Sequence, residues 1–362
     1  MIQDALTKHE KLVLFALTED ATRTDAAVAE RVGMRESTAG ENRRKLLSRG
    51  YLVFSNVPAY HKLGFEFAAD IHMYSNPSLK KQVPVSAYGA FFANYPRIFD
   101  AFTGDGYLGC LGIFESYTVL SKFLDDLSLF LTRNDVRPVN LSHSVFPFET
   151  TRCTLEYNYA PSLNRIWTLD QSEVAPASFG IRKPEKVELT PREARLFSEL
   201  ISFPTKSDRD MAATFKRSRA SITEMRNRLM KKGLYTRLAM PSINSLAFDR
   251  LMQVYLRFDR PVSFKEKASI AGPDWWHQAI AILEKSYEII ASYPLKDLQD
   301  SHYILSNYIQ PFYSAGVLTE EPKIYVHRCG TTVDFTETHH SAIIDETRKL
   351  WISHARPVKK ST

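Results

Sequence analysis

The chain has 362 residues, of which 44% are hydrophobic and 24% charged, as in soluble globular proteins, and its length favours more than one domain. Its formal net charge of +6 and pI near 9.0 favour anionic partners. No apolar run reaches the roughly 20 residues that span a bilayer, and three scattered cysteines argue against a disulfide framework, so we expect a cytoplasmic protein with no membrane partner and no secretion signal.

A segment with the pattern of three helices occurs twice. Residues 6–50 align without a gap over residues 189–233, an offset of 183 residues. Each copy opens with a threonine followed three residues later by a glutamate, which is the sequence of a capping box. These pairs are Thr7 with Glu10 and Thr190 with Glu193. The second helix of each copy is predicted to take an aspartate, Asp25 or Asp208, as its N-cap.

The third helix of each copy is predicted at residues 37–49 and 220–232, after a short turn. Each ends at a glycine, Gly50 or Gly233, which suits the left-handed conformation past a helix C-terminus. Three short helices with a tight turn before the third are typical of a helix-turn-helix. The pattern therefore predicts two modules that place a recognition helix in the major groove of double-stranded DNA.

The charge of the third helices favours this interpretation, because the segment from Lys216 to Arg237 is basic with the single acid Glu224. Short polar or forked side chains near the start of the helix suit base edges. In the first copy the expected DNA-binding residues are Arg35, Ser37, Thr38, Glu41, Asn42, Arg43, Arg44 and Lys45. In the second they are Lys216, Arg217, Arg219, Ser221, Thr223, Arg226, Asn227 and Lys231. We expect the second, more basic module to bind the backbone more tightly.

Alternating and helical spacings after each module predict the order βαββαβ. In the first half these segments are residues 65–75, 85–95, 98–105, 107–114, 117–134 and 136–148. The second half follows the same order less clearly, from residue 247 to residue 329. Residues 152–169 alternate too regularly for a free linker and are expected to add a strand.

The chain resembles two tandem copies of the Lrp/AsnC, or feast/famine, transcription regulators, over residues 6–150 and 189–335. In that family the third helix carries Glu-x-x-Arg-Arg/Lys-Leu before a terminal Gly-aromatic pair. Here these residues are Glu41, Arg44, Lys45, Leu46, Gly50 and Tyr51. Arg43 is a departure, since the family usually has a packed apolar residue there.

The resemblance implies an α+β protein, in which two winged helix-turn-helix domains are each followed by a ferredoxin-like βαββαβ effector and oligomerisation domain. The expected boundaries are residues 1–60 and 61–169 for the first half, 170–188 for a linker, 189–245 and 246–335 for the second half, and 336–362 for a C-terminal helix and basic tail.

The family commonly carries Thr-Gly-x-x-Asp at the hairpin near its amino-acid effector site. This chain has Thr103, Gly104, Asp105, Gly106 and Tyr107, with the tyrosine where the acid is expected. The resemblance makes this hairpin the candidate site for a small-molecule effector, although the glycines also suit a tight turn without any ligand.

The sequence shows no persuasive catalytic constellation, and we expect no metal, no cofactor and no reaction. His339 and His340 are expected to point to different sides of a C-terminal helix at residues 337–351, as surface or partner contacts. Sirohaem decarboxylases resemble the same regulators, and the histidines on predicted effector-domain elements keep that alternative open. They are His72, His143, His302 and His327.

A third hypothesis is a protein-interaction platform, for which exposed aromatic residues would supply the surface. Our preferred interpretation is a sequence-specific regulator of transcription whose tandem halves act as a pseudo-dimer on double-stranded DNA. Its two unlike recognition helices then imply two dissimilar half-sites, and the chains are expected to pair again as homodimers.

Overall fold

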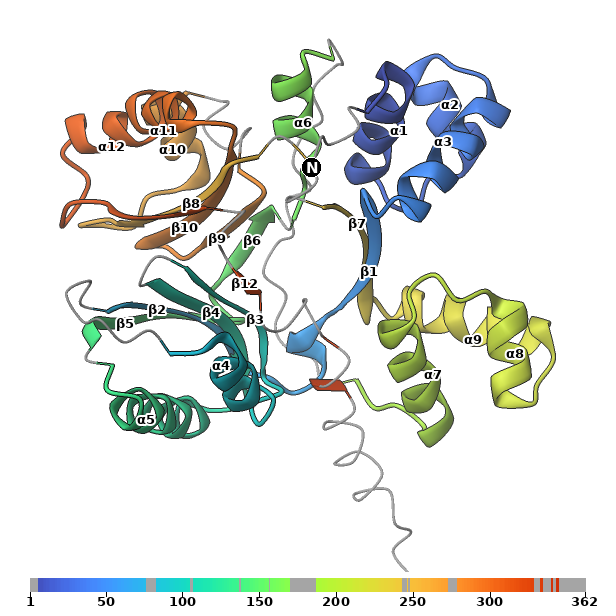
Figure 1. The fold of residues 1–362 in the computed structure, drawn as a ribbon, viewed down its shortest axis with the longest axis horizontal. Helices are drawn as coiled ribbons and strands as arrows, with labels where there is room; N and C mark the ends of the chain where they lie inside the picture. The colour runs from blue at the N-terminus through green and yellow to red at the C-terminus, as the bar shows by residue number, and fades with distance from the viewer. Residues whose placement is uncertain are drawn as a thin grey trace, which may run out of the picture. The chain divides into compact units, whose positions relative to one another are not determined.

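The computed structural model describes residues 6–75, 83–104, 107–136, 138–155, 157–169, 187–242, 246, 248–272, 279–328, 333–334, 340 and 343–344. It divides into two compact units that do not follow the linear order of the chain (Figure 1). Unit 1 comprises Met1–Phe54, Thr150–Ile181 and Leu238–Thr332. Unit 2 comprises Ser55–Glu149, Arg182–Arg237 and Val333–Thr362.

Each unit contains one segment of three helices. Module 1, in unit 1, consists of α1 (Lys8–Glu19), α2 (Asp25–Val32) and α3 (Glu36–Ser48). Module 2, in unit 2, consists of α7 (Pro191–Ser202), α8 (Asp208–Phe215) and α9 (Arg219–Lys231). Leu14, Leu17 and Leu46 are fully buried in module 1, as Leu196, Phe197 and Leu229 are in module 2. The apolar spacing that predicted the helices is therefore the spacing that builds their cores.

The helix ends agree with the sequence in one respect and differ in another. Both predicted capping boxes are confirmed, at Thr7 and Thr190. The predicted N-caps of α2 and α8 are wrong by one residue, because Thr24 and Ser207 accept the capping hydrogen bonds. The two aspartates take the next position, and their carboxylates bind other partners described below.

The sheet of unit 2 is built from the first half of the sequence. Its central elements are β2 (Phe67–Ser75), α4 (Val85–Phe92), β3 (Ile98–Gly104), β4 (Tyr107–Phe114), α5 (Tyr117–Arg133) and β5 (Pro138–Pro147), with strand order β3-β4-β2-β5. Alternate residues of β2, including Ile71, pack with Phe123 and Leu127 of α5. The other residues of β2, including Asp70 and His72, occupy the opposite face of the strand.

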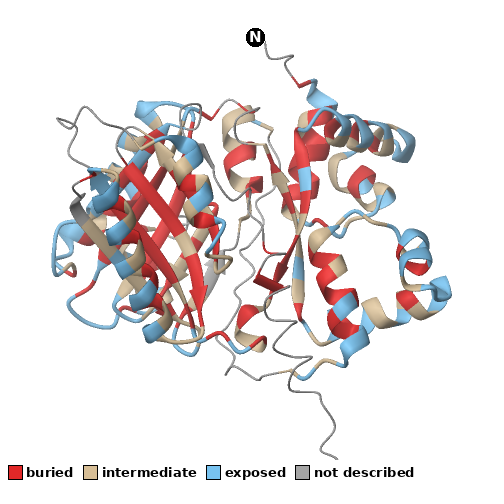
Figure 2. Ribbon diagram, turned by 60° about the horizontal axis from the view of Figure 1, so that its bottom comes forward, coloured by how far each residue is buried: buried red, intermediate tan, exposed pale blue. Residues whose placement is uncertain are grey.

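The sheet of unit 1 is built from the second half in the same order. Its elements are β8 (Arg250–Arg257), α10 (Phe264–Ala271), β9 (Ala281–Glu284), β10 (Glu288–Leu295), α11 (Leu298–Ile304), a π-helical turn (Leu305–Ile309), α12 (Gln310–Ser314) and β11 (Lys323–Arg328). The strand order is β9-β10-β8-β11. Val254 and Tyr293 pack with Phe312 on the helical face. Figure 2 shows that buried residues follow the strands and that exposed residues lie on the outer sides of the helices.

Each sheet gains a fifth strand from the half of the sequence that did not build it. β6 (Arg152–Leu155) follows β5 in sequence but pairs with β9 of unit 1, and β12 (Val333–Asp334) follows β11 but pairs with β3 of unit 2. The strand expected within residues 152–169 is thus confirmed as β6. The helix α6 (Ala160–Trp167) comes next and buries Leu163 in the core of module 1.

The chain passes between the units along β1 (Leu52–Pro58) and again along β7 (Tyr235–Pro241), which are paired in a two-stranded sheet. In unit 1, the amide of Ser242 donates to the carbonyl of Tyr51 at 3.1 Å. In unit 2, the side-chain amide of Asn56 donates to the carbonyl of Leu200 at 2.8 Å. Leu52 of β1 and Ala239 of β7 are buried in the core of module 1, and Tyr235 of β7 packs against the core of module 2, so the two strands contribute to both units.

The expectation for the C-terminal helix needs a correction. His340 is 3% exposed, and its ring nitrogen Nδ1 hydrogen-bonds the hydroxyl of Tyr60. Ile343 and Ile344 lie in the same core as the helices of module 2. His340 is thus an internal packing residue and not a surface contact; His339 lies outside the described residues. Within the described part of the chain, no helix is long and apolar enough to cross a membrane.

The capping-box glutamates should make folding pH-dependent. Burial by itself raises the pKa of Glu10, but hydrogen bonds from Thr7 and the charge of Arg49 hold that pKa below its usual value of 4.5, and Glu193 is lowered in the same way by Thr190 and Lys232. A lowered folded-state pKa stabilises the fold above the unfolded-state pKa, and this contribution is lost as the pH falls through the folded-state pKa.

We therefore expect Glu10→Gln and Glu193→Gln each to lower the free energy of unfolding by about 1–3 kcal/mol at pH 7. The difference from the wild type should shrink as the pH falls below about 4.5. Urea unfolding followed by circular dichroism at pH 7 and pH 3.5 measures it. Glu224→Gln is the control, because that side chain is 76% exposed. A loss that is independent of pH would contradict this account.

Candidate nucleic-acid interface

The start of α9 presents a cluster of cationic side chains. Lys216 and Arg217 lie in the turn before the helix, Arg219 is its first residue, and Lys231 is its last. All four are exposed, and among the described residues none has a side-chain partner. Ser218 caps the helix by accepting a hydrogen bond from the amide of Ser221 at 3.2 Å. The N-terminus of the helix and the cations of Lys216, Arg217 and Arg219 together suit a phosphate group, whereas Lys231 lies at the opposite end of the helix.

A second set of expected DNA-binding residues is held inside module 2. Arg226 forms an ion pair with Asp208 at 2.8 Å and donates to the carbonyl of Lys206 at 3.2 Å. The hydroxyl of Thr223 donates to the other oxygen of Asp208 at 2.7 Å. These contacts tie α9 to the N-terminus of α8. They fix the position of α9, and they leave Arg226 half-buried while Arg219 is exposed.

Module 1 repeats this arrangement at the matching positions. Arg43 forms an ion pair with Asp25 at 3.0 Å and donates to the carbonyl of Arg23 at 2.6 Å. Gly40 stands where module 2 has a threonine, and an added Cβ there would lie 2.8 Å from an oxygen of Asp25. The glycine thus leaves room for the aspartate. Arg43 is thus held within the module by its ion pair with Asp25.

The rest of the third helix of module 1 offers fewer free cations. Asn42 is buried, and its side-chain amide donates to the carbonyl of Thr38 at 2.8 Å. Lys45 forms an ion pair with Glu41 at 2.7 Å, and hydrogen bonding to Lys45 lowers the pKa of Glu41. Among the residues of module 1 that were expected to bind DNA, Arg35, Ser37, Glu41, Arg44 and Lys45 are exposed, whereas Thr38 and Arg43 are half-buried. Arg35 stands at the N-cap but makes no side-chain capping bond.

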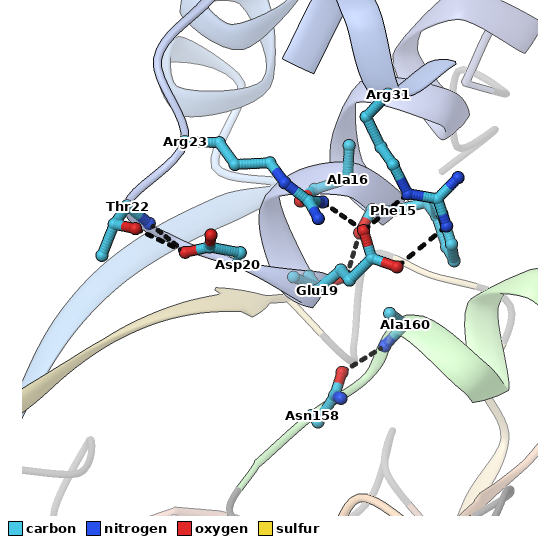
Figure 3. Close-up of polar contacts among 10 residues, drawn as sticks. Phe15, Ala16, Glu19, Asp20, Thr22, Arg23, Arg31, Asn158 and Ala160 are labelled. Atoms are coloured by element: carbon cyan, nitrogen blue, oxygen red, sulfur yellow. Dashed lines mark hydrogen bonds and ion pairs between the residues drawn. The ribbon is translucent and has the colours of Figure 1, made fainter. Parts of the chain in front are cut away.

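Other arginines of module 1 serve its own fold (Figure 3). Arg31 binds the carboxylate of Glu19 through two hydrogen bonds of 2.8 and 2.9 Å, and Arg23 contacts the same carboxylate. The side chain of Glu19 is 1% exposed. Such a bidentate, buried pair is among the stronger polar contacts in proteins. It fixes the C-terminus of α1 against α2 and removes two cations from the surface.

The candidate effector hairpin is only partly described. The hydroxyl of Thr103 donates to the carbonyl of Tyr107 at 2.8 Å, at the end of the β3–β4 pair where Gly104 lies opposite Tyr107. The hydroxyl of Tyr107 hydrogen-bonds His72 Nδ1, and His72 Nε2 lies 2.7 Å from Asp70. Tyr107 therefore points into a buried polar network. Asp105 and Gly106 lie outside the described residues.

The histidines considered for a tetrapyrrole do not gather within either unit. His143 pairs with Ile71 across β5 and β2, so it shares the helical face with Ile71 and lies opposite the face of His72. In unit 1, His302 is exposed on α11, whereas His327 is buried on β11. The described residues contain no group of His, Cys, Asp or Glu that could hold a metal ion. This geometry does not favour the tetrapyrrole enzyme.

Comparison with known proteins gives a partial likeness. No family model and no curated protein matches the chain. A transcriptional regulator from Neisseria meningitidis in complex with L-methionine is 17% identical over 39% of this chain and 89% of that chain, with a TM-score of 0.32. The leucine response regulatory protein of Mycobacterium tuberculosis is 21% identical over 39% and 91%, with a TM-score of 0.29. An AsnC family transcriptional regulator from Agrobacterium tumefaciens is 13% identical over 39% and 89%, with a TM-score of 0.30. Likenesses at these TM-scores establish neither the fold nor the function of this chain.

The positioning role of the two arginines was missed from the sequence. A signal for it was present, because the overlay of the two copies matches Asp25 with Asp208 and Arg43 with Arg226. A retained pair of opposite charges indicates a contact between them more directly than it indicates two surface ligands. Because α9 is strongly basic, the sequence analysis assigned Arg226 to DNA contacts together with Arg219.

We expect the Asp208–Arg226 pair to contribute coupling energy to the stability of module 2. The partners are 16% and 21% exposed, so removing either one should cost about 1–3 kcal/mol. A double-mutant cycle with Asp208→Ala and Arg226→Ala, followed by chemical unfolding, measures the coupling. The matched cycle with Asp25→Ala and Arg43→Ala serves as the internal comparison. Additive losses in both cycles would show that the arginines do not position the helices.

Proposed function

We propose that the protein is a sequence-specific transcription regulator that binds double-stranded DNA through its two helical modules. The observation that carries the proposal is the exposed cationic start of α9, where three side chains without described partners flank the helix N-terminus. This is the end of a recognition helix that enters the major groove. The cations would neutralise phosphates, and the helix would read base edges.

Individual side chains divide into three roles in this proposal. Backbone contacts come from Lys216, Arg217, Arg219 and Lys231 in module 2, and from Arg35, Arg44 and Lys45 in module 1. Base edges are read by Ser221 and Asn227 in module 2, and by Ser37, Thr38 and Glu41 in module 1. Arg43, Arg226, Thr223 and Asn42 support the helices from inside, since each has the intramolecular contacts described above.

We further propose that the two halves are copies of one unit and act together as a pseudo-dimer. Each half has three helices, a βαββαβ segment and a trailing edge strand, in the same order. In this interpretation the modules are winged helix-turn-helix domains and the sheets are ferredoxin-like domains. The exchanged strands β6 and β12 support a pairing within one chain.

A small-molecule effector would act at the hairpin formed by Thr103, Gly104 and Tyr107. The support is its place in the resembling family and the polar network behind Tyr107. Whole chains would associate as homodimers, and light scattering after size exclusion distinguishes one chain of 41.4 kDa from two.

Binding to the protein's own promoter region, followed by fluorescence anisotropy, tests the function. Each neutralised phosphate contributes a slope of about −0.9 to log K against log salt. The four proposed backbone contacts of module 2 alone therefore predict a loss of about 100-fold in affinity between 50 and 200 mM salt, and the proposed contacts of module 1 add to that loss. Tight binding that outcompetes random duplex is expected. Binding of a protein partner without any affinity for duplex DNA would favour the interaction platform instead.

The base-reading role of Asn227 gives a separate prediction. This side chain is exposed on α9 and uncharged. Asn227→Ala should lower the preference for the specific duplex over random duplex by about 1–3 kcal/mol while leaving the salt slope unchanged. Asn307→Ala, on an exposed helical position of unit 1, is the control. A uniform loss on both duplexes would show that Asn227 does not read bases.

A further inference from the structure

The geometry points to unequal binding of DNA by the two modules, in which module 2 anchors the phosphate backbone and module 1 binds its half-site more weakly. We infer that the operator is a bipartite site with one strongly and one weakly held half. This inference rests on the proposed function and specifies how its surface is used. Three observations carry it.

The first observation is the charge at matching positions before and at the start of the third helix. Module 2 has Lys216, Arg217, Ser218 and Arg219, whereas module 1 has Gly33, Met34, Arg35 and Glu36. The first set carries three cations, and the second carries one cation beside one acid. An exposed carboxylate at the first position of α3 would lie where a phosphate approaches the helix, and it would repel that phosphate.

The second observation is the backbone conformation at the C-cap of the second helix. Gly33 ends α2 with φ of +68°, and Lys216 ends α8 with φ of +52°. Glycine adopts this left-handed conformation readily, whereas a residue with a Cβ destabilises the fold there. Lys216 is exposed and has no side-chain partner among the described residues. Its side chain therefore adds positive charge at a position where glycine would favour folding.

The third observation is that other arginines in module 1 form ion pairs within the module. Arg23 and Arg31 bind Glu19, and Arg43 binds Asp25. These arginine side chains are about one-fifth exposed. Their contacts stabilise the helices of module 1. Module 1 thus uses most of its arginines internally, while module 2 keeps a cluster at the surface.

The left-handed backbone conformation of Lys216 allows a test in which the folding stability and the affinity for DNA are expected to change in opposite directions. Lys216→Gly should raise the melting temperature of the full chain and weaken its affinity for the promoter duplex by about 5- to 10-fold at 0.1 M salt, since one phosphate contact is lost. The salt slope should become shallower by about 0.9. The matched variant Gly33→Lys should lower the melting temperature and strengthen binding.

A charge exchange at matching positions removes net charge as an explanation. The double variant Glu36→Arg with Arg219→Glu keeps the composition and the net charge of the wild type. We expect hydroxyl-radical footprinting to show strong protection of one half-site by the wild type and reduced contrast between the half-sites with the double variant. The triple variant Lys216→Ala, Arg217→Ala, Arg219→Ala removes the cations of module 2 before and at the start of α9, and Arg35→Ala removes the one cation of module 1 in the matching segment, with the larger loss of affinity expected for the triple variant.

The outcomes separate this inference from the proposed function. If the wild type binds duplex DNA with salt sensitivity but protects both half-sites equally in footprinting, the unequal binding by the two modules is overturned and DNA binding stands. If Lys216→Gly raises the melting temperature without changing affinity, the lysine is a solvated surface residue and the anchor is overturned. If the wild type binds no duplex at any salt concentration, the proposed function fails, and the inference fails with it.

Discussion

Both modules depend on one ion pair between the second and third helices. In each, an aspartate at the first position of the second helix holds an arginine that lies in the middle of the third. The same arginine donates to a backbone carbonyl in the turn after the first helix, at Arg23 or Lys206. One guanidinium therefore joins three segments that are otherwise held by a small apolar core. Because the direction of the third helix decides which side chains can reach a groove, this contact sets the geometry of the whole candidate interface.

A second constraint acts on the sheets. Without β6, the strand β9 would leave an unpaired edge, and without β12 the same would hold for β3. Long open edges invite pairing with other chains, and a very short edge strand such as β6 or β12 limits that pairing. Each closing strand comes from the half of the sequence that did not build the sheet. Neither half therefore completes its sheet from its own residues, which ties the folding of the two halves to each other.

The sequence predicted features that depend on neighbouring residues well, and features that depend on contacts between distant segments poorly. The capping boxes at Thr7 and Thr190, the glycine ends of the third helices and the strands on either side of the Thr103 hairpin depend on neighbouring residues, and they are present. The exchange of edge strands depends on pairing between distant segments, which periodicity does not encode. The burial of His340 was missed for the same reason, since its partner Tyr60 is 280 residues away in sequence. Within the candidate site, the sequence identified the basic helix but could not tell a positioning arginine from an exposed one.

The comparison of the two modules explains why charge alone is a poor guide to a nucleic-acid surface. Both third helices contain several basic residues. A count of these residues would make the two modules look more alike than a comparison of their exposed, unpaired cations does. In module 1 the guanidinium groups of Arg23, Arg31 and Arg43 satisfy buried or half-buried carboxylates, so their charge is neutralised at short range. In module 2 the cations around the start of α9 have no such carboxylate among the described residues, and their field extends into solvent. A backbone position that favours glycine but carries Lys216 adds to this difference, because folding stability alone would select against that side chain.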